Sequence, residues 1–203
     1  MTEMKMFRRD ALAMLSLVFA GAGCASGREG GDGDPLQRLA HHFGRRVVAV
    51  PDAKMLHASH APSVPLPRDY LRFLATFGPC TFQDGRFLLS VADLTSATDP
   101  TTLDLFAVLY DRDYRVGVQT LPGFRGIPGV IPWAYDDQGT TLYWVAQTRN
   151  PDEWTVAMSG TTNDLVLVQE STVQLLSTSL FDEIPYYEPG NRFDLETLTV
   201  TRH

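Results

Sequence analysis

Cysteine is scarce in this chain, since only Cys24 and Cys80 occur among its 203 residues. Two cysteines allow at most one disulfide, and they form no Cys-x-x-Cys pair. Long apolar runs are also missing. The apolar run near the N-terminus, Ala11–Ala20, has about 10 residues, whereas a helix needs about 20 to cross a bilayer, so we expect no permanent membrane span.

Basic charge is in short supply. The chain has 17 Lys and Arg against 24 Asp and Glu, a net charge of −7. Residues 1–23 hold three basic and two acidic side chains, so the chain from Cys24 onward carries 14 basic and 22 acidic groups, a net charge of −8. Nucleic-acid binding relies on Lys and Arg to neutralise phosphates, so we expect no nucleic acid as partner. A basic protein partner suits this charge. An apolar content of 44% is enough for a genuine core.

Sequence signatures of catalysis are missing as well. No Gly-x-Ser-x-Gly, phosphate loop or dinucleotide-binding fingerprint occurs. His41 and His42 are adjacent and would point apart on a helix, while His57 and His60 lie beside prolines that indicate a loop. Cys80 has no charged neighbour in the sequence to favour a thiolate, which indicates a buried structural thiol. We therefore predict no enzyme, no metal site and no cofactor.

The N-terminus has the order of an export signal. Lys5, Arg8 and Arg9 precede the apolar run, and the small residues Gly21-Ala22-Gly23 follow it, directly before Cys24. A cysteine in that place resembles the bacterial lipobox, in which it is diacylated and becomes the new N-terminus. The Arg8-Arg9 pair also resembles a twin-arginine export signal.

These features predict a membrane-anchored lipoprotein of the bacterial cell envelope. Residues 1–23 would be the export signal, and residues 24–34, rich in Gly and charge, the lipid anchor with a flexible tether. Two alternatives stay open: cleavage without lipidation, and a cytoplasmic protein, whose N-terminus would be an uncleaved helix or whose true start would be Met4 or Met6. A Cys24–Cys80 disulfide is a further alternative, which acylation of Cys24 would exclude.

Apolar periodicity predicts the order of the elements. Apolar residues repeat at helical spacing over residues 36–43, 68–77 and 103–110. Strand patterns occur over residues 82–91, around an Asp-Gly turn, over 129–135 with 140–146, and over 153–158. Residues 165–168 start either a strand or a closing helix. Helices first and strands afterwards describe an α+β fold. We predict a single domain over 35–190, a mostly antiparallel sheet with helices packed on one face, followed by a C-terminal tail over 191–203.

Three segments in this order resemble the SUKH superfamily, the Smi/Knr-type domain. Residues 66–74 read Leu-Pro-Arg-Asp-Tyr-Leu-Arg-Phe-Leu, which matches the family pattern Leu-Pro-x-Asp-Tyr-x-x-Phe-Leu. Residues 131–139 read Ile-Pro-Trp-Ala-Tyr-Asp-Asp-Gln-Gly and lead into Leu142-Tyr143-Trp144, like the family's second signature. Residues 152–156, a tryptophan strand after an acidic turn, resemble the third. The similarity covers the chain from about Leu36 to about Tyr187.

The resemblance implies a domain that binds proteins and has no catalytic centre. In bacteria such domains resemble immunity proteins that neutralise toxins by stoichiometric binding, and we expect this function here, with a basic toxin as partner. The alternative is a scaffold or binding protein of the cell envelope or cell wall.

Acidic turns and aromatic residues are the candidate partner-binding residues. They are Trp133, Tyr135, Asp136, Asp137, Asp152 and Glu153. Aromatic side chains anchor many interfaces, and carboxylates would attract a basic partner. Ordinary turn chemistry for the acids and core packing for the aromatic residues are the competing interpretations.

Overall fold

The computed structural model describes residues 33–49, 66–95, 112–123, 127–159, 162–181 and 193–202, all within the compact unit Gly33–His203. The predicted export signal, Cys24, most of the tether, His57, His60 and the predicted helix over 103–110 lie outside the described residues. Within them, no helix combines the length and the apolarity that a membrane crossing requires.

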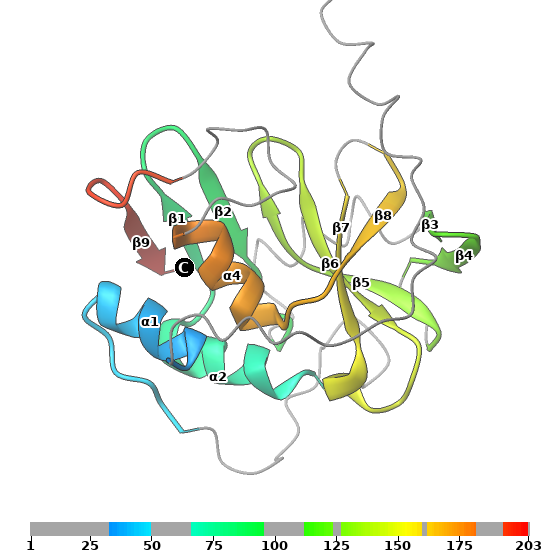
Figure 1. Cartoon of the computed structure of the whole chain (residues 1–203), viewed down its shortest axis with the longest axis horizontal. Coiled ribbons are helices and arrows are strands. Elements are labelled where there is room, and N and C mark those ends of the chain that lie inside the picture. The colour runs from blue at the N-terminus through cyan, green and yellow to red at the C-terminus, as the bar shows by residue number, and fades with distance from the viewer. Residues whose placement is uncertain are drawn as a thin grey trace, which may run out of the picture. The chain divides into compact units, whose positions relative to one another are not determined.

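A nine-stranded sheet forms the body of the domain (Figure 1). In spatial order its strands are β4 (Gln119–Pro122), β3 (Asp113–Val116), β8 (Asp164–Val168), β7 (Thr155–Ser159), β6 (Thr141–Ala146), β5 (Gly129–Asp136), β2 (Leu88–Val91), β1 (Cys80–Gln83) and β9 (Thr199–Arg202). All neighbours are antiparallel except β3 and β8. The helices are α1 (Pro35–His42), α2 (Arg68–Phe77) and α4 (Thr172–Phe181), and a short 3-10 helix, η1 (Pro151–Glu153), precedes β7. This is the predicted α+β architecture with a mostly antiparallel sheet and helices packed on one face.

Helix α2 buries the stripe that its sequence predicts. Tyr70, Phe73 and Phe77 are at most 1% exposed and pack towards the sheet. The helix ends at Gly78, whose φ of +73° favours glycine. A Cβ atom at Gly78 would also lie 2.3 Å from Nε of Arg202 on β9, so a larger residue there would displace the guanidinium group of that side chain.

Helix α1 joins α2 through one carboxylate. The side chain of Asp34 accepts a hydrogen bond from the N–H of Leu36 and so caps α1, and it also forms an ion pair with Arg72. The apolar side of α1 buries Leu36 and Leu39. The three helices therefore form one layer, which is seen in front of the sheet in Figure 1.

The predicted hairpins are present. Strands β1 and β2 flank the turn that contains Gly85 at φ +86°, and β5 pairs with β6 around a turn that contains Gly139 at φ +86°. Residues 165–168 lie in the strand β8, and the closing helix, α4, begins only at Thr172.

The expectation of a C-terminal tail over 191–203 was wrong for its last residues. Residues 199–202 form β9, which pairs antiparallel with β1 along its full length. The turn before β2 holds the segment in place, because Asp84 Oδ2 accepts a hydrogen bond from the N–H of Asp194 at 2.6 Å. Thr197 Oγ1 also donates to the carbonyl oxygen of Asp84. A four-residue strand that is mostly exposed carries little apolar periodicity, so the sequence pattern did not predict this strand.

Candidate partner-binding groove

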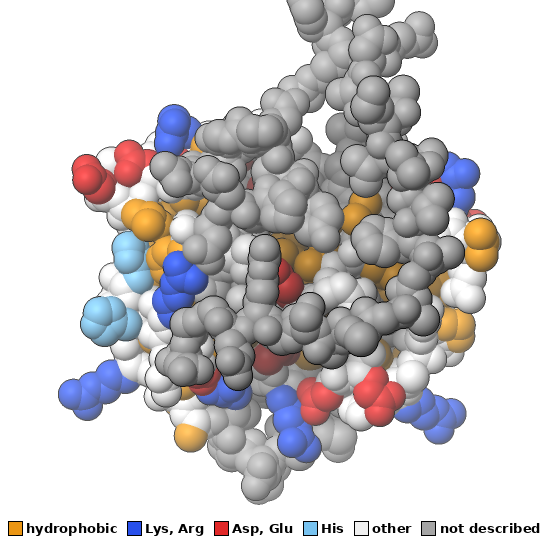
Figure 2. Space-filling model, viewed as in Figure 1, with side chains coloured by type: hydrophobic (Ala, Val, Ile, Leu, Met, Phe, Trp, Pro, Cys, Tyr) orange, Lys and Arg blue, Asp and Glu red, His pale blue; other side chains and the backbone are white. Residues whose placement is uncertain are grey.

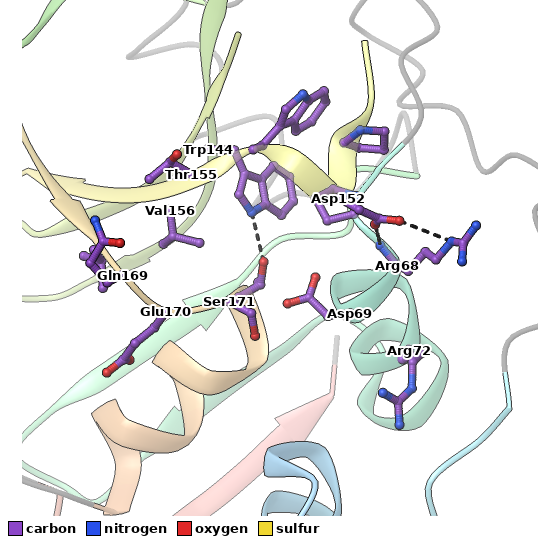
Figure 3. A pocket seen from close by; sticks show the side chains of 15 residues that line it. Arg68, Asp69, Arg72, Trp144, Asp152, Thr155, Val156, Gln169, Glu170 and Ser171 are labelled. Carbon is purple, nitrogen blue, oxygen red and sulfur yellow. Dashed lines mark hydrogen bonds and ion pairs between the residues drawn. The ribbon is translucent and has the colours of Figure 1, made fainter. Parts of the chain in front are cut away.

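An open groove of about 600 Å³ lies where the N-terminal ends of α2 and α4 meet strands β6, β7 and β8 (Figure 3). We call it the α2–α4 groove. Its lining residues come from four places in the chain, and they are Pro67, Arg68, Asp69, Arg72, Trp144, Pro151, Asp152, Trp154, Thr155, Val156, Val168, Gln169, Glu170, Ser171 and Thr172.

Asp152 holds the start of α2. Helix α2 begins after Pro67, whose side chain has no oxygen to accept a hydrogen bond from the first turn. Asp152 supplies that acceptor from η1: its Oδ1 accepts from the N–H of Arg68 at 2.8 Å, and its Oδ2 lies 3.3 Å from Arg68 Nε. Figure 3 shows both contacts at one end of the groove. A carboxylate at a helix N-terminus also interacts favourably with the helix dipole.

Asp69 holds the start of α4 in the same way. Its Oδ2 accepts a hydrogen bond from the N–H of Val173 at 3.2 Å, and its Oδ1 accepts from the N–H of Tyr70 at 2.7 Å. Ser171 adds a second cap to α4, since its Oγ accepts from the N–H of Gln174 at 3.3 Å. Two helix ends that line one groove are thus fixed by carboxylates from other elements.

Aromatic packing joins the same elements beneath the groove. The ring of Trp144 lies 4.8 Å from that of Tyr70 in an edge-to-face contact, 5.7 Å from that of Trp133 in a stacked one, and 6.2 Å from that of Trp154. The indole N–H of Trp144 donates to Thr172 Oγ1 at 3.0 Å, which ties the strand to α4 (Figure 3). Buried aromatic pairs of this kind add to the stability that burial alone provides.

The rim of the groove carries both signs of charge. Its ionisable residues are two arginines, Arg68 and Arg72, and three acids, Asp69, Asp152 and Glu170. Both arginines are in ion pairs, with Asp152 and Asp34 respectively, yet the side chain of Arg68 remains 79% exposed. Figure 2 shows basic and acidic side chains mixed along the lower edge of the view.

Two of the predicted partner-binding residues are placed where no partner reaches them. Trp133 is 0% exposed and stacks on Trp144, so it belongs to the core. Asp136 is only 9% exposed, and its Oδ1 accepts hydrogen bonds from the N–H groups of Gln138 and Thr140. Core packing and turn chemistry, the competing interpretations, explain these two residues.

Asp137 and Tyr135 are more accessible, but they too hold the fold together. Asp137 Oδ1 accepts a hydrogen bond from the N–H of Leu88 at 3.2 Å, which links the β5–β6 turn to β2. Tyr135 is half-buried and stands opposite Ser90 in the β2–β5 ladder.

The two acidic turns do not form one surface. The turn with Asp136 and Asp137 precedes β6, and η1, with Asp152 and Glu153, follows it. Six residues of strand separate them, which is roughly 20 Å at about 3.3 Å per residue. Glu153 is exposed and engaged locally, accepting hydrogen bonds from Asn150 Nδ2 at 2.8 Å and Thr148 Oγ1 at 3.0 Å. Of the six predicted residues, only Asp152 lines the α2–α4 groove.

Sequence reasoning missed most of the groove. Asp69 belongs to the motif over residues 66–74, and this motif was the sequence signal that could have indicated it. Arg68, Gln169 and Glu170 stand in no pattern that predicts a site. They are brought together only because α2 and α4 start at the same edge of β6 and β7.

The buried thiol of Cys80 and the buried phenol of Tyr114 do not line the groove. Burial raises the pKa of the Cys80 thiol to about 12, and the charges of Arg45 and Arg202 offset this only in part. Burial and the neighbouring Tyr143 likewise raise the pKa of Tyr114. Over the described ranges, no three His, Cys, Asp or Glu side chains gather as a metal site would require.

Comparison of the chain with protein-family models, with curated proteins and with solved structures found no match.

Proposed function

We propose that this chain is a protein-binding domain without a catalytic centre, displayed at the cell envelope through a lipid on Cys24, which neutralises a basic toxin by stoichiometric binding. The α2–α4 groove is the partner site. One observation carries this proposal. The three segments that resemble the SUKH signatures meet at the groove, through the Tyr70–Trp144 ring contact and the Asp152–Arg68 ion pair.

The state of two of the three groove carboxylates supports binding over catalysis. A general acid or base must be within reach of a substrate proton and able to exchange one. Asp69 and Asp152 instead accept hydrogen bonds from backbone N–H groups of α4 and α2, respectively, which are structural roles. The same contacts fix both helix ends before any partner arrives, and a rim that is already ordered loses less conformational entropy on binding.

Size and charge indicate how the partner is held. A volume of about 600 Å³ admits a few side chains of a protein partner rather than a whole element. The chain from Cys24 onward carries a net charge of −8, so it attracts a basic protein before the two surfaces touch. The groove then selects the side chains of the partner that make contact.

Gln169 allows a sharp test. It lines the groove, is exposed, and lies just after β8. Gln83 is another exposed glutamine, on β1 near the opposite end of the sheet from β8, and provides the matched control. The partner tested is the product of the gene next to this one, expressed with each variant. We expect wild type and Gln83→Arg to bind it one to one and to protect cells from it, and Gln169→Arg to bind at least tenfold more weakly, about 1.4 kcal/mol.

The outcomes separate the alternatives. Equal binding by Gln169→Arg and Gln83→Arg in calorimetry would remove the groove from the interface. A neighbouring product that binds but does not arrest growth when expressed alone would favour the envelope scaffold over the immunity protein.

A further inference from the structure

Strand β8 has a neighbouring strand on each side, but the two neighbours pair with different parts of it. On one side β7 follows it along Val166, Leu167 and Val168. On the other side β3 pairs only with Asp164 and Leu165, because β3 ends at Val116 and the chain turns away at Gly117, where φ is +60°. In the described part of the chain, no strand pairs with residues 166–168 on the β3 side.

The direction of the backbone groups shows which residue is open there. Asn163 directs its carbonyl towards β3, where it accepts a hydrogen bond from the N–H of Arg115 at 2.9 Å. Successive residues of a strand direct their N–H and C=O groups to alternate sides. Leu165 therefore faces β3, Val166 and Val168 face β7, and Leu167 presents its N–H and C=O to the side that β3 has left.

Exposed apolar side chains surround this open edge. Five large hydrophobic residues of the described chain are exposed, and three of them lie here: Val118 at 104%, Val166 at 43% and Leu167 at 42%. The hairpin turn with Val118 follows directly on the β3 residue that stands opposite Leu165. Val166 and Leu167 point to opposite faces of β8, so each face of an added strand would meet one of them. Figure 2 shows hydrophobic side chains at the surface over this end of the sheet, at the right of the view.

The residues of the open edge are followed in the chain by residues of the α2–α4 groove. Val168, Gln169 and Glu170, the residues that follow Leu167, line the groove. A chain that lies along β8 is thereby directed to the groove, with Glu170 close to where it arrives.

We propose that the partner binds by strand addition: an extended segment of a basic protein pairs with the backbone of Leu167 and continues into the α2–α4 groove. This inference rests on the proposed function and names the form of the partner. Backbone hydrogen bonds would supply affinity, and alternate side chains specificity. The segment would carry apolar residues for Val118, Val166 and Leu167, and a Lys or Arg for Glu170, in keeping with the acidic charge of the chain.

The probe is a capped heptapeptide of alternating Lys and Val, added at millimolar concentration to the full chain. Amide hydrogen exchange and chemical shifts by NMR are the readouts. In the free protein, the amide of Leu167 should exchange faster than those of Val166 and Val168, which bond to β7. The peptide should slow exchange at Leu167 at least tenfold. A peptide N-methylated at alternate amides keeps its side chains and charge but loses strand donors, and it should bind at least tenfold more weakly.

Two variants of the protein complete the test. Leu167→Pro removes the outward N–H and leaves the β7 ladder bonds in place, so it should abolish peptide binding. Leu167→Ala keeps the N–H and should weaken binding no more than about fivefold. If Leu167→Pro does not fold, the N-methylated peptide still decides the question. Equal binding of the two peptides, or no change at Leu167, overturns the strand addition.

Failure here is distinguishable from failure of the proposed function. If the product of the neighbouring gene binds wild type and Leu167→Pro equally but loses affinity for Gln169→Arg, the groove is supported as the partner site and strand addition is refuted. If none of the variants alters its binding, both proposals fall.

Discussion

Replacing Phe73 by alanine tests whether α2 is docked as the structure places it. Phe73 is 0% exposed, and its ring stacks on that of Phe77 at 5.1 Å and lies 6.2 Å from that of Phe82. Truncation of such a side chain removes its burial and leaves a cavity, which costs about 3–5 kcal/mol. Natural domains have unfolding free energies of about 5–15 kcal/mol, so Phe73→Ala should lose about a fifth of the stability or more. For a domain of this size, the midpoint of thermal unfolding should fall by roughly 6–20 °C.

The control is Arg72→Ala on the same helix. The Arg72 side chain is 42% exposed, and its ion pair with Asp34 is partly solvated, so its loss should cost at most about 1 kcal/mol. Urea unfolding followed by tryptophan fluorescence suits both variants, because Trp133 and Trp144 pack against α2 through Tyr70. The slope with urea should stay unchanged. A Phe73→Ala variant as stable as Arg72→Ala would refute the packing of α2 on the sheet.

Three further predictions concern single side chains. Burial raises the pKa of Asp84, but the N–H groups of Asp194, Phe87 and Arg86 and the charge of Arg86 outweigh it and hold the pKa below its usual 3.8. The stability that the ionised Asp84 provides is fully present at pH values above the usual pKa and is lost as the pH falls through the lowered pKa. The urea midpoint of Asp84→Asn should therefore be lower than that of wild type at pH 7. On acidification the midpoint of the variant should fall less than that of wild type. A midpoint difference that does not change with pH would contradict this role. In a Cys24→Ser background, Cys80 should not react with a disulfide reagent at pH 8 until urea unfolds the chain, because burial keeps the thiol protonated. Rapid reaction of the folded chain would disprove this prediction. Clickable palmitate should label wild-type cells and not Cys24→Ser, and equal labelling would end the lipoprotein hypothesis.

Local patterns explain why the predicted elements were found. Tyr70, Phe73, Leu74 and Phe77 repeat at helical spacing, and only a helix places them on one face. The Asp-Gly turn at Asp84 likewise determines a hairpin from its nearest neighbours. The candidate site did not follow in the same way, because an aromatic residue next to a turn has the same sequence signature whether it is exposed or buried. The bulge in β5 at Trp133 turns that ring into the core.

By itself, the sequence determined the helices, the main hairpins, the α+β class and the acidic charge, since each follows from residues close together in the chain or from composition. Only the tertiary structure decided the groove, the open edge of β8 and the last strand. Asp152 caps a helix 84 residues away, Asp69 caps another 104 residues away, and Asp84 holds a segment 110 residues away. Such contacts depend on strand order and register, and no local pattern encodes which distant N–H group a carboxylate will meet.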